Sequence, residues 1–263
     1  MEFDIIDVGG AKRSSELNLV SLMRERSALV VRNCRLDEYA LMSVAESLGQ
    51  PLEYKVEASN RMFGKGPITY LEGSQNEAMS LGRDMMPLHN DGVVFKQQID
   101  FLLLYCSELS QEYPGGDTII CDQRSALDDL EADLMSTLMT VKVEYLLVNK
   151  WFHDLVDKSE EWVETSPIIL DDKGHAFLTV ELPYPEGVVP GWKVRIQGWG
   201  EDESAAFLDR LARHFNREAY CYTHEWQKDD LLVLKNRETL HGRSKLEPHG
   251  VRHLMRCHIK AMP

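Results

Sequence analysis

Apolar residues recur at helical spacing near the start of the chain, and a short apolar run separates two such stretches. Residues 15–27 place leucine, valine and methionine side chains at intervals of three and four, which predicts an amphipathic helix. Residues 27–32, Ser-Ala-Leu-Val-Val-Arg, predict a short buried strand. A second helix is expected from Asp37 to Leu48, with Gly49 just past its end as a stop signal.

The centre and the C-terminal part of the chain change to strand-like patterns. Short apolar runs bounded by turn residues predict strands at residues 98–106, 117–121, 141–148, 168–170, 176–182, 230–234 and 252–260. Helical spacing returns at residues 125–140 and 203–215. Helices around many strands indicate an α+β fold built on a sandwich or barrel of sheets.

The length and the absence of repeats favour one folding unit. Chains of about 200–250 residues can fold as one domain around a barrel or sandwich. The sequence of 263 residues contains no internal repeat and no linker rich in Pro, Gly or Ser. We therefore expect a single domain over residues 1–263.

Charge and cysteine content exclude several classes of partner. The chain carries 29 basic and 43 acidic side chains, a net charge of −14, and its pI is near 5.1. This balance argues against nucleic acid and against anionic membranes, which both attract clustered Lys and Arg. The five cysteines form no C-x-x-C pair, which is typical of reduced thiols. With no signal peptide and no apolar run near the roughly 18 residues of a membrane span, we expect a soluble, cytoplasmic protein.

Two separated segments supply candidate metal ligands. His89 and Asp91 are two positions apart, so on a strand their side chains would point to the same face. His241 follows the strongest apolar strand near the C-terminus. Two imidazoles and one carboxylate form the facial triad of non-haem Fe(II) oxygenases. The same set also occurs in catalytic zinc sites, so a zinc hydrolase is an alternative.

Two arginines favour the oxygenase. Arg252 and Arg256 are four positions apart, and an even spacing keeps both guanidinium groups on one face of a strand. Arginine binds carboxylates through two parallel hydrogen bonds. Two such groups near iron indicate two acidic ligands, one of them a dicarboxylate co-substrate. Taken alone, two surface arginines are the plainer interpretation, and a zinc hydrolase leaves the pair unexplained.

These motifs together resemble the taurine dioxygenase (TauD/TfdA-like) superfamily of Fe(II)- and 2-oxoglutarate-dependent dioxygenases. The resemblance covers roughly residues 75–260. Its motifs are His89-x-Asp91, the turn Gly115-Gly116-Asp117-Thr118, the strand beginning at Asp230, the segment Asn236 to Arg243, and the arginine pair. Within the superfamily the sequence is most similar to carbapenem synthase and the clavaminate-synthase-like group. Lys235 departs from the pattern, because many relatives carry Asp there.

The resemblance implies a fold and a role for each motif residue. The fold would be a double-stranded β-helix (jelly-roll, cupin-like) core flanked by helices, with a substrate-covering insertion around residues 150–200. His89, Asp91 and His241 would hold Fe(II). Thr118 and Arg252 would bind the distal carboxylate of 2-oxoglutarate, and Arg256 would anchor an acidic group of the primary substrate.

The resemblance also implies an activity. With O2, the enzyme would oxidise a C–H bond of a small acidic molecule and release succinate and CO2. The substrate would be amino-acid-derived or carbapenem/β-lactam-like, from secondary metabolism such as antibiotic biosynthesis. Hydroxylation, desaturation, cyclisation and epimerisation all stay open. Alternatives are a non-catalytic protein that binds metal or 2-oxoglutarate, and a sulfonate or amino-acid hydroxylase like taurine dioxygenase. A homo-oligomer is also open.

Overall fold

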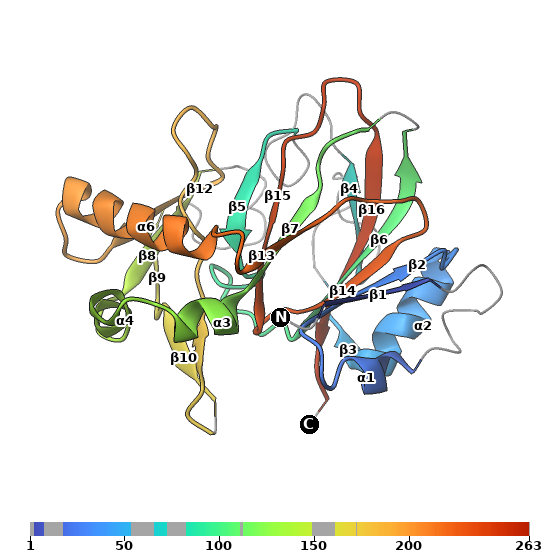
Figure 1. Ribbon diagram of the computed structural model, residues 1–263, viewed down its shortest axis with the longest axis horizontal. Helices are drawn as coiled ribbons and strands as arrows, with labels where there is room; N and C mark the ends of the chain where they lie inside the picture. Colours follow the sequence, from blue (N-terminus) through green and yellow to red (C-terminus); the bar gives the residue numbers. More distant parts are fainter. Residues whose placement is uncertain are drawn as a thin grey trace.

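Two β-sheets face one another at the centre of the molecule, and helices cover their outer sides (Figure 1). The computed structural model describes residues 3–7, 18–53, 66–72, 83–110, 113–148, 161–171 and 173–262. Its mixed α/β architecture agrees with the expected class. None of the helices in these ranges has the length and apolar character needed to cross a membrane.

The larger sheet has the strand order β1-β2-β14-β6-β16-β3, and β4 also pairs with β16. β1 and β2 are parallel, whereas the other pairs in this sheet are antiparallel. The strands are β1 (Phe3–Asp7), β2 (Ala28–Arg32), β3 (Gln50–Pro51), β4 (Ile68–Glu72), β6 (Phe101–Leu109), β14 (Leu231–Lys235) and β16 (Arg252–Lys260).

The smaller sheet has the antiparallel order β13-β7-β15-β5. Its strands are β5 (Met86–His89), β7 (Thr118–Asp122), β13 (Cys221–His224) and β15 (Thr239–Arg243). Backbone hydrogen bonds from Asn90 to Val180 and from Leu182 to Leu88 add a further stretch of chain beside β5. The centre of this sheet therefore brings together segments from three distant parts of the sequence.

The outer face of the larger sheet is covered by α1 (Leu19–Leu22) and α2 (Glu38–Leu48). The Asp37 side chain caps α2 by accepting a hydrogen bond from the Ala40 N–H at 2.8 Å. Gly49 follows α2, where a Cβ atom would lie 2.3 Å from the Lys260 carbonyl oxygen. Only glycine allows this close approach, which confirms the predicted stop signal.

The central strands of the larger sheet are apolar on both faces. Leu29, Val31 and Val233 pack towards the helices. Their neighbours Leu232 and Leu234 pack towards the smaller sheet. A strand buried on both faces shows a continuous apolar run instead of alternation. This explains why residues 230–234 stand out in the sequence.

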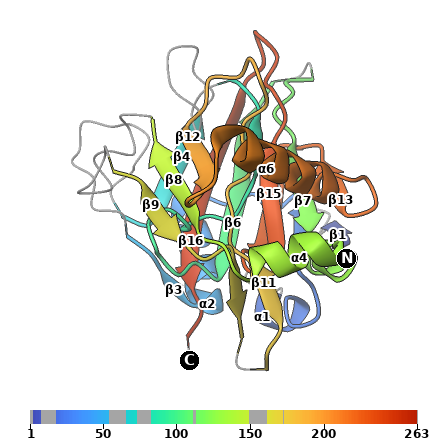
Figure 2. The ribbon, with the colours of Figure 1, turned by 90° about the vertical axis from the view of Figure 1, so that its left-hand side faces the viewer.

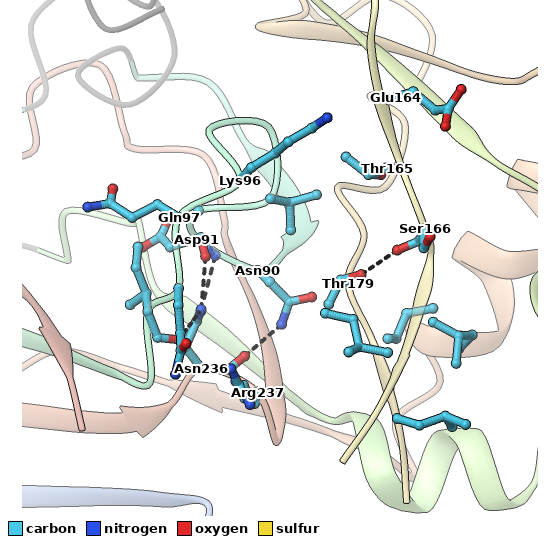
Figure 3. A pocket seen from close by; sticks show the side chains of 18 of the residues that line it. Asn90, Asp91, Lys96, Gln97, Glu164, Thr165, Ser166, Thr179, Asn236 and Arg237 are labelled. Carbon is cyan, nitrogen blue, oxygen red and sulfur yellow. Dashed lines mark hydrogen bonds between the residues drawn. The ribbon is translucent and has the colours of Figure 1, made fainter. Parts of the chain in front are cut away.

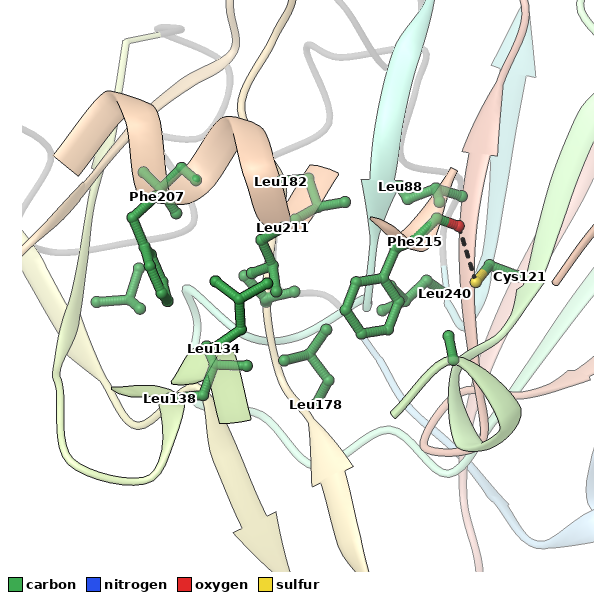
Figure 4. Close-up of a cluster of buried hydrophobic side chains, with 14 of the residues drawn as sticks. Leu88, Cys121, Leu134, Leu138, Leu178, Leu182, Phe207, Leu211, Phe215 and Leu240 are labelled. Carbon is green, nitrogen blue, oxygen red and sulfur yellow. Dashed lines mark hydrogen bonds between the residues drawn. The ribbon is translucent and has the colours of Figure 1, made fainter. Parts of the chain in front are cut away.

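A third group of elements packs against the smaller sheet on its far side, at the left of Figure 1. Among the described residues it contains the sheet β12-β8-β9, the hairpin β10-β11 and the helices α3, α4 and α6, of which α6 crosses the front in Figure 2. The elements are α3 (Gln123–Asp128), α4 (Ala132–Leu138), β8 (Val143–Leu147), β9 (Val163–Thr165), β10 (Ile168–Leu170), β11 (Ala176–Leu178), β12 (Trp192–Ile196) and α6 (Glu201–Phe215). Phe207, Leu211 and Phe215 of α6 enter the apolar cluster that joins this group to the sheet (Figure 4).

The single helix predicted over residues 125–140 is wrong. The chain forms α3 and α4 with a turn between them, where the buried Leu130 side chain enters the core. Asp128 and Asp129 end α3, and acidic side chains at a helix C-terminus oppose the helix dipole. The predicted helix at residues 15–27 is helical only over Leu19–Leu22, and residues 15–17 lie outside the described ranges.

Most other expected elements are confirmed with shifted ends. The helix at residues 203–215 begins earlier, at Glu201. Strands at residues 168–170 and 252–260 have the predicted bounds. The strand at residues 176–182 ends at Leu178, because the chain then leaves β10 and hydrogen-bonds alongside β5.

Phe215 belongs to the apolar cluster that joins the third group of elements to the smaller sheet, and it is fully buried (Figure 4). Replacing it with Ala removes a large side chain from a packed interior, so we expect the free energy of unfolding to fall by about 3–5 kcal/mol. Urea unfolding measures this change. The matched control is Val189→Ala, at a side chain that is 69% exposed, for which we expect a change within about 0.5 kcal/mol. Equal effects of the two substitutions would contradict the assigned core.

Candidate active site

Strand pairing brings the two predicted histidine ligands together. His241 on β15 is the register partner of His89 on β5, and the two ring centroids are 4.2 Å apart. Asp91 follows β5, with its Oδ1 3.6 Å from His89 Nε2 and its Oδ2 3.6 Å from His241 Nε2. One ligand atom from each residue lies within 4.8 Å of the others. The structure therefore gathers the three predicted ligands into one cluster that can surround a single ion.

The Asp91 loop is fixed by two asparagines (Figure 3). The Asn236 side chain accepts a hydrogen bond from the Asp91 N–H at 3.1 Å and donates one to the Asp91 carbonyl at 2.9 Å. Asn90 donates in return to the carbonyls of Asn236 at 2.7 Å and Thr239 at 3.0 Å. The loop is thereby joined to the turn that leads into β15 and His241.

Gly92 lets the chain turn away directly after Asp91. Its φ angle of +94° lies in the left-handed region, and an added Cβ would lie 2.4 Å from the Gln97 carbonyl oxygen. The Gln97 N–H closes the turn by donating to the Gly92 carbonyl at 3.0 Å. A side chain at position 92 would displace the Asp91 carboxylate, one of the three candidate metal ligands.

A hydrogen bond fixes the tautomer of His89, and burial favours the neutral form of His241. Burial opposes the charged form of His89 as well, but the hydrogen bond and the charge of Asp91 outweigh it and raise the pKa of His89. His89 Nδ1 lies 2.9 Å from the Pro87 carbonyl, which can only accept, so Nδ1 carries the proton and Nε2 is left with its lone pair. Burial lowers the pKa of His241 to about 3. A neutral imidazole is the form that binds metal.

Asp91 stays ionised because of a third histidine that the sequence analysis left out. His258 Nε2 donates to Asp91 Oδ2 at 2.7 Å. Burial opposes ionisation of Asp91, but the charge and the hydrogen bond of His258 outweigh it. They hold the pKa of Asp91 well below its usual range. His258 lies two positions after Arg256, so the even-spacing argument used for the arginines also points to it.

A narrow cavity of about 50 Å³ adjoins the cluster, between the two sheets. Apolar side chains form part of its wall. Its polar lining residues are His89, Thr118, His241, Arg243, Arg252 and Arg256. Five of the six residues that the sequence assigns to the site thus line one cavity, and only Asp91 is not among its lining residues. The five are His89, Thr118, His241, Arg252 and Arg256.

Arg252 is a buried cation that forms no salt bridge within the part of the chain that the structure describes. Its Nη1 donates to the Gly116 carbonyl at 2.6 Å, while its Nε has no hydrogen-bond partner. No described carboxylate lies within salt-bridge distance of it, and burial lowers its pKa to about 9. An unpaired buried charge is costly, so this side chain favours an anionic ligand in the cavity.

The Gly115-Gly116 turn provides the room for Arg252. Gly116 has a φ angle of +72°, and a Cβ there would lie 2.7 Å from Leu246 Cδ1 and 3.2 Å from Arg252 Nε. Glycine is therefore required twice, for backbone conformation and for space. This gives the motif that leads into Thr118 a physical reason.

The other two arginines face the same cavity with part of their hydrogen bonds already made. Arg256 Nε donates to Thr69 Oγ1 on β4 at 3.1 Å. Arg243, which the sequence analysis did not assign to the site, donates to the Asp84 carbonyl at 2.6 Å. Burial lowers the pKa of Arg243 to about 10. The cavity is thus lined by three guanidinium groups.

The first residue of β12 and a residue of the segment before it lie next to His89. The ring centroid of Trp192 is 5.7 Å from that of His89, and its Nε1 donates to the Leu182 carbonyl at 3.1 Å. Glu181 forms an isolated bridge with His89, and burial raises the pKa of its carboxyl group to about 8. No sequence signal marks Glu181, because its place beside His89 depends on the pairing of distant segments.

A wider groove of about 670 Å³ lies between the Asp91 loop and strands β9–β11 (Figure 3). Lys96 and Lys142 line it together with apolar residues of β10 and β11. Lys142 Nζ already donates to Ser166 Oγ at 2.7 Å. Asp91 is part of this lining as well, so the groove adjoins the metal-binding loop.

Fold and site together define a class of protein. Two imidazoles and one carboxylate leave coordination positions open for other ligands, as in non-haem Fe(II) oxygenases. The neighbouring cavity presents buried cationic donors to an anion. The chain belongs to the taurine catabolism dioxygenase TauD, TfdA family, whose profile matches residues 3–258.

Relatives with known functions support this membership. The chain is 25% identical to 3-((Z)-2-isocyanoethenyl)-1H-indole synthase of Fischerella ambigua, covering 66% of this chain and 63% of that enzyme. It is 25% identical to the alpha-ketoglutarate-dependent 2,4-dichlorophenoxyacetate dioxygenase of Cupriavidus pinatubonensis, over 96% of this chain and 91% of that one. The crystal structure of PvcB from Pseudomonas aeruginosa has a similar fold, with a TM-score of 0.73 at 19% identity, over 98% of this chain and 86% of that one.

The predicted enzyme class and cofactors are confirmed at this level. The protein is an Fe(II)/2-oxoglutarate-dependent dioxygenase, with O2 as the second co-substrate. The cluster of His89, Asp91 and His241 fits Fe(II).

His258→Leu removes the N–H that donates to Asp91 Oδ2 and fills the space with an apolar side chain of similar size. We expect the affinity for Fe(II) to fall about 10- to 100-fold, because groups that orient metal ligands contribute that much. His258→Gln, which keeps an N–H donor, is expected to lose less. Anaerobic competition with a chromogenic chelator measures both affinities. Wild-type affinity in the Leu variant would show that this hydrogen bond does not position the ligand.

Proposed function

We propose that the protein oxidises a C–H bond of a small, carboxylate-bearing metabolite and converts 2-oxoglutarate and O2 into succinate and CO2. The observation that carries this proposal is that the cluster of His89, Asp91 and His241 adjoins the cavity that contains the buried Arg252 guanidinium, whose Nε has no hydrogen-bond partner among the described residues. A metal-binding cluster beside a cationic cavity suits an acid that contacts both.

The side chains of the site divide the binding of metal, co-substrate and substrate among them. His89, Asp91 and His241 hold Fe(II), and Asn236 and His258 keep Asp91 in place. Thr118 and Arg252 bind the distal carboxylate of 2-oxoglutarate, and Arg256 anchors the acidic group of the primary substrate. When bound, iron and 2-oxoglutarate supply an oxidant strong enough to take hydrogen from carbon. Arg256 thereby selects the reacting carbon, because an error of about 1 Å in placement can cost on the order of 100-fold in rate.

The proposed substrate class is inferred from the arginines that line the cavity and from the names of two related enzymes. The 2,4-dichlorophenoxyacetate dioxygenase acts, by its name, on a carboxylate, and the other enzyme makes an isonitrile of indole. These names support an amino-acid-derived or aromatic acid and secondary metabolism. The specific similarity to carbapenem synthase and a role in antibiotic biosynthesis stay predictions. Hydroxylation, desaturation, cyclisation and epimerisation stay alternative outcomes.

We also propose the finer architecture that the family resemblance implies. The two facing sheets form a double-stranded β-helix within one domain over residues 1–263. Residues of the insertion around 150–200 cover the substrate, supported by the position of Trp192 behind His89. Residues 149–160 of this insertion lie outside the described ranges. The cytoplasmic location, the exclusion of nucleic acid and the open homo-oligomeric state stay as the sequence predicts them.

Asp91→Ala tests the metal assignment. It removes the only carboxylate of the cluster, so we expect loss of iron-dependent conversion of 2-oxoglutarate to succinate, with the fold retained in circular dichroism. Asp209→Ala, which removes an exposed carboxylate on α6, is the matched control and is expected to keep full activity. Turnover that survives in the Asp91 variant would refute the triad and favour a different metal site.

Arg252→Ala and Arg256→Ala test the division between co-substrate and substrate. We expect Arg252→Ala to weaken 2-oxoglutarate binding about tenfold or more, because it removes charge-assisted hydrogen bonds. Arg256→Ala is expected to leave that affinity nearly unchanged and to raise the ratio of succinate formed to substrate oxidised. Calorimetry and product analysis measure these quantities. Equal losses of 2-oxoglutarate affinity in both variants would contradict the assignment.

A further inference from the structure

Trp226 lies directly behind Thr118. Its indole Nε1 donates to Thr118 Oγ1 at 3.1 Å. Both side chains are buried, with 6% of Trp226 and 3% of Thr118 exposed. Trp226 follows β13, whose last residue His224 is the register partner of Thr118 on β7. The two residues are 108 positions apart in sequence.

The chemistry of the two groups decides which way the Thr118 hydroxyl points. An indole N–H can only donate, whereas a hydroxyl has one hydrogen and two acceptor lone pairs. Since Trp226 donates, Thr118 Oγ1 uses a lone pair towards it, and the hydroxyl hydrogen must point elsewhere. Among the described residues no acceptor takes that hydrogen, and Thr118 lines the cavity that contains Arg252. The hydrogen is therefore available to an acceptor in the cavity.

The indole itself is held in place. The ring of His224 packs edge-on against it, with centroids 4.6 Å apart and an interplanar angle of 73°. His224 and Asp230 are fully buried, and His224 Nε2 lies 3.3 Å from Asp230 Oδ2. The Asp230 carboxylate also accepts the Gln227 N–H at 3.0 Å, which closes the turn after Trp226. The direction of the indole N–H is thus fixed by its surroundings.

We propose that Trp226 is a positioning residue that makes Thr118 an obligate hydrogen-bond donor to the carboxylate of the co-substrate. Together with the Arg252 guanidinium, this gives the inner end of the cavity donors only, which suits an ionised carboxylate. The inference rests on the proposed binding of 2-oxoglutarate by Thr118 and Arg252. It adds that the contribution of the Thr118 hydroxyl depends on the Trp226 N–H.

A double-mutant cycle tests this dependence. The protein is loaded with Zn(II), which accepts the same ligands but has no redox chemistry, and 2-oxoglutarate binding is measured by calorimetry. Wild type, Thr118→Val, Trp226→Phe and the double variant form the cycle. Trp199→Phe, at an indole that packs against Phe207 of α6, is the matched control.

We expect Thr118→Val to weaken binding about tenfold or more, and Trp226→Phe about three- to tenfold. In the Thr118→Val background, Trp226→Phe is expected to add almost nothing, because no hydroxyl is left to orient. Thr118→Ser is expected to keep near wild-type affinity, and Trp199→Phe to change nothing. Independent effects that multiply in the double variant would overturn the inference.

A spectroscopic measurement covers the case in which Trp226→Phe does not fold. In ¹⁵N-labelled, Zn(II)-loaded protein, one indole N–H resonance is expected to move in Thr118→Val, to return near its place in Thr118→Ser, and to move again when 2-oxoglutarate binds wild type. No change of any indole resonance in Thr118→Val overturns the inference. If wild type binds no 2-oxoglutarate at all, the proposed function fails instead.

Discussion

The reciprocal hydrogen bonds between Asn236 and the Asp91 backbone hold the two halves of the metal site together. They join positions that are 145 residues apart, and Asn90 makes the matching bonds in the opposite direction. The pairing of β5 with β15 brings His89 to His241, and the asparagine bonds fix the Asp91 loop against the turn that leads into β15. Each buried amide that loses its partner costs about 1–3 kcal/mol, so the asparagines act on stability and on geometry at once. Gly92, His89 and His258 all lie next to Asp91, so their contributions to the site depend on where this loop is held.

The charges of the site follow from the same arrangement. Asp91 is surrounded by three imidazoles and stays ionised, whereas Arg252 is a buried cation that forms no salt bridge with any described carboxylate. The site therefore suits a divalent cation beside Asp91 and an anion beside Arg252. Because unpaired buried charges oppose folding, ligands that neutralise them stabilise the folded state by mass action. Stability and ligand binding are therefore linked in this protein.

The parts predicted from sequence are those whose signal is local. The histidine and aspartate ligands stand in short motifs, and the spacing of Arg252 and Arg256 places them on one face of β16. The strand at residues 230–234 is recognisable because both of its faces are buried. The pattern over residues 125–140 is continuous, so the break at Leu130 depends on tertiary packing. His258, Glu181 and Trp226 were missed because their roles arise from contacts between distant strands, although the spacing of His258 from Arg256 was a usable signal.

The most direct test of the account is anaerobic addition of Fe(II) and then 2-oxoglutarate to the protein, followed by visible absorption spectroscopy. A 2-oxo acid that chelates iron gives a metal-to-ligand charge-transfer band, which neither component gives alone. We expect this band to appear in wild type and to shift when an acidic substrate enters the site. Iron binding without any such band would contradict the assignment of the cavity at Thr118 and Arg252 to 2-oxoglutarate.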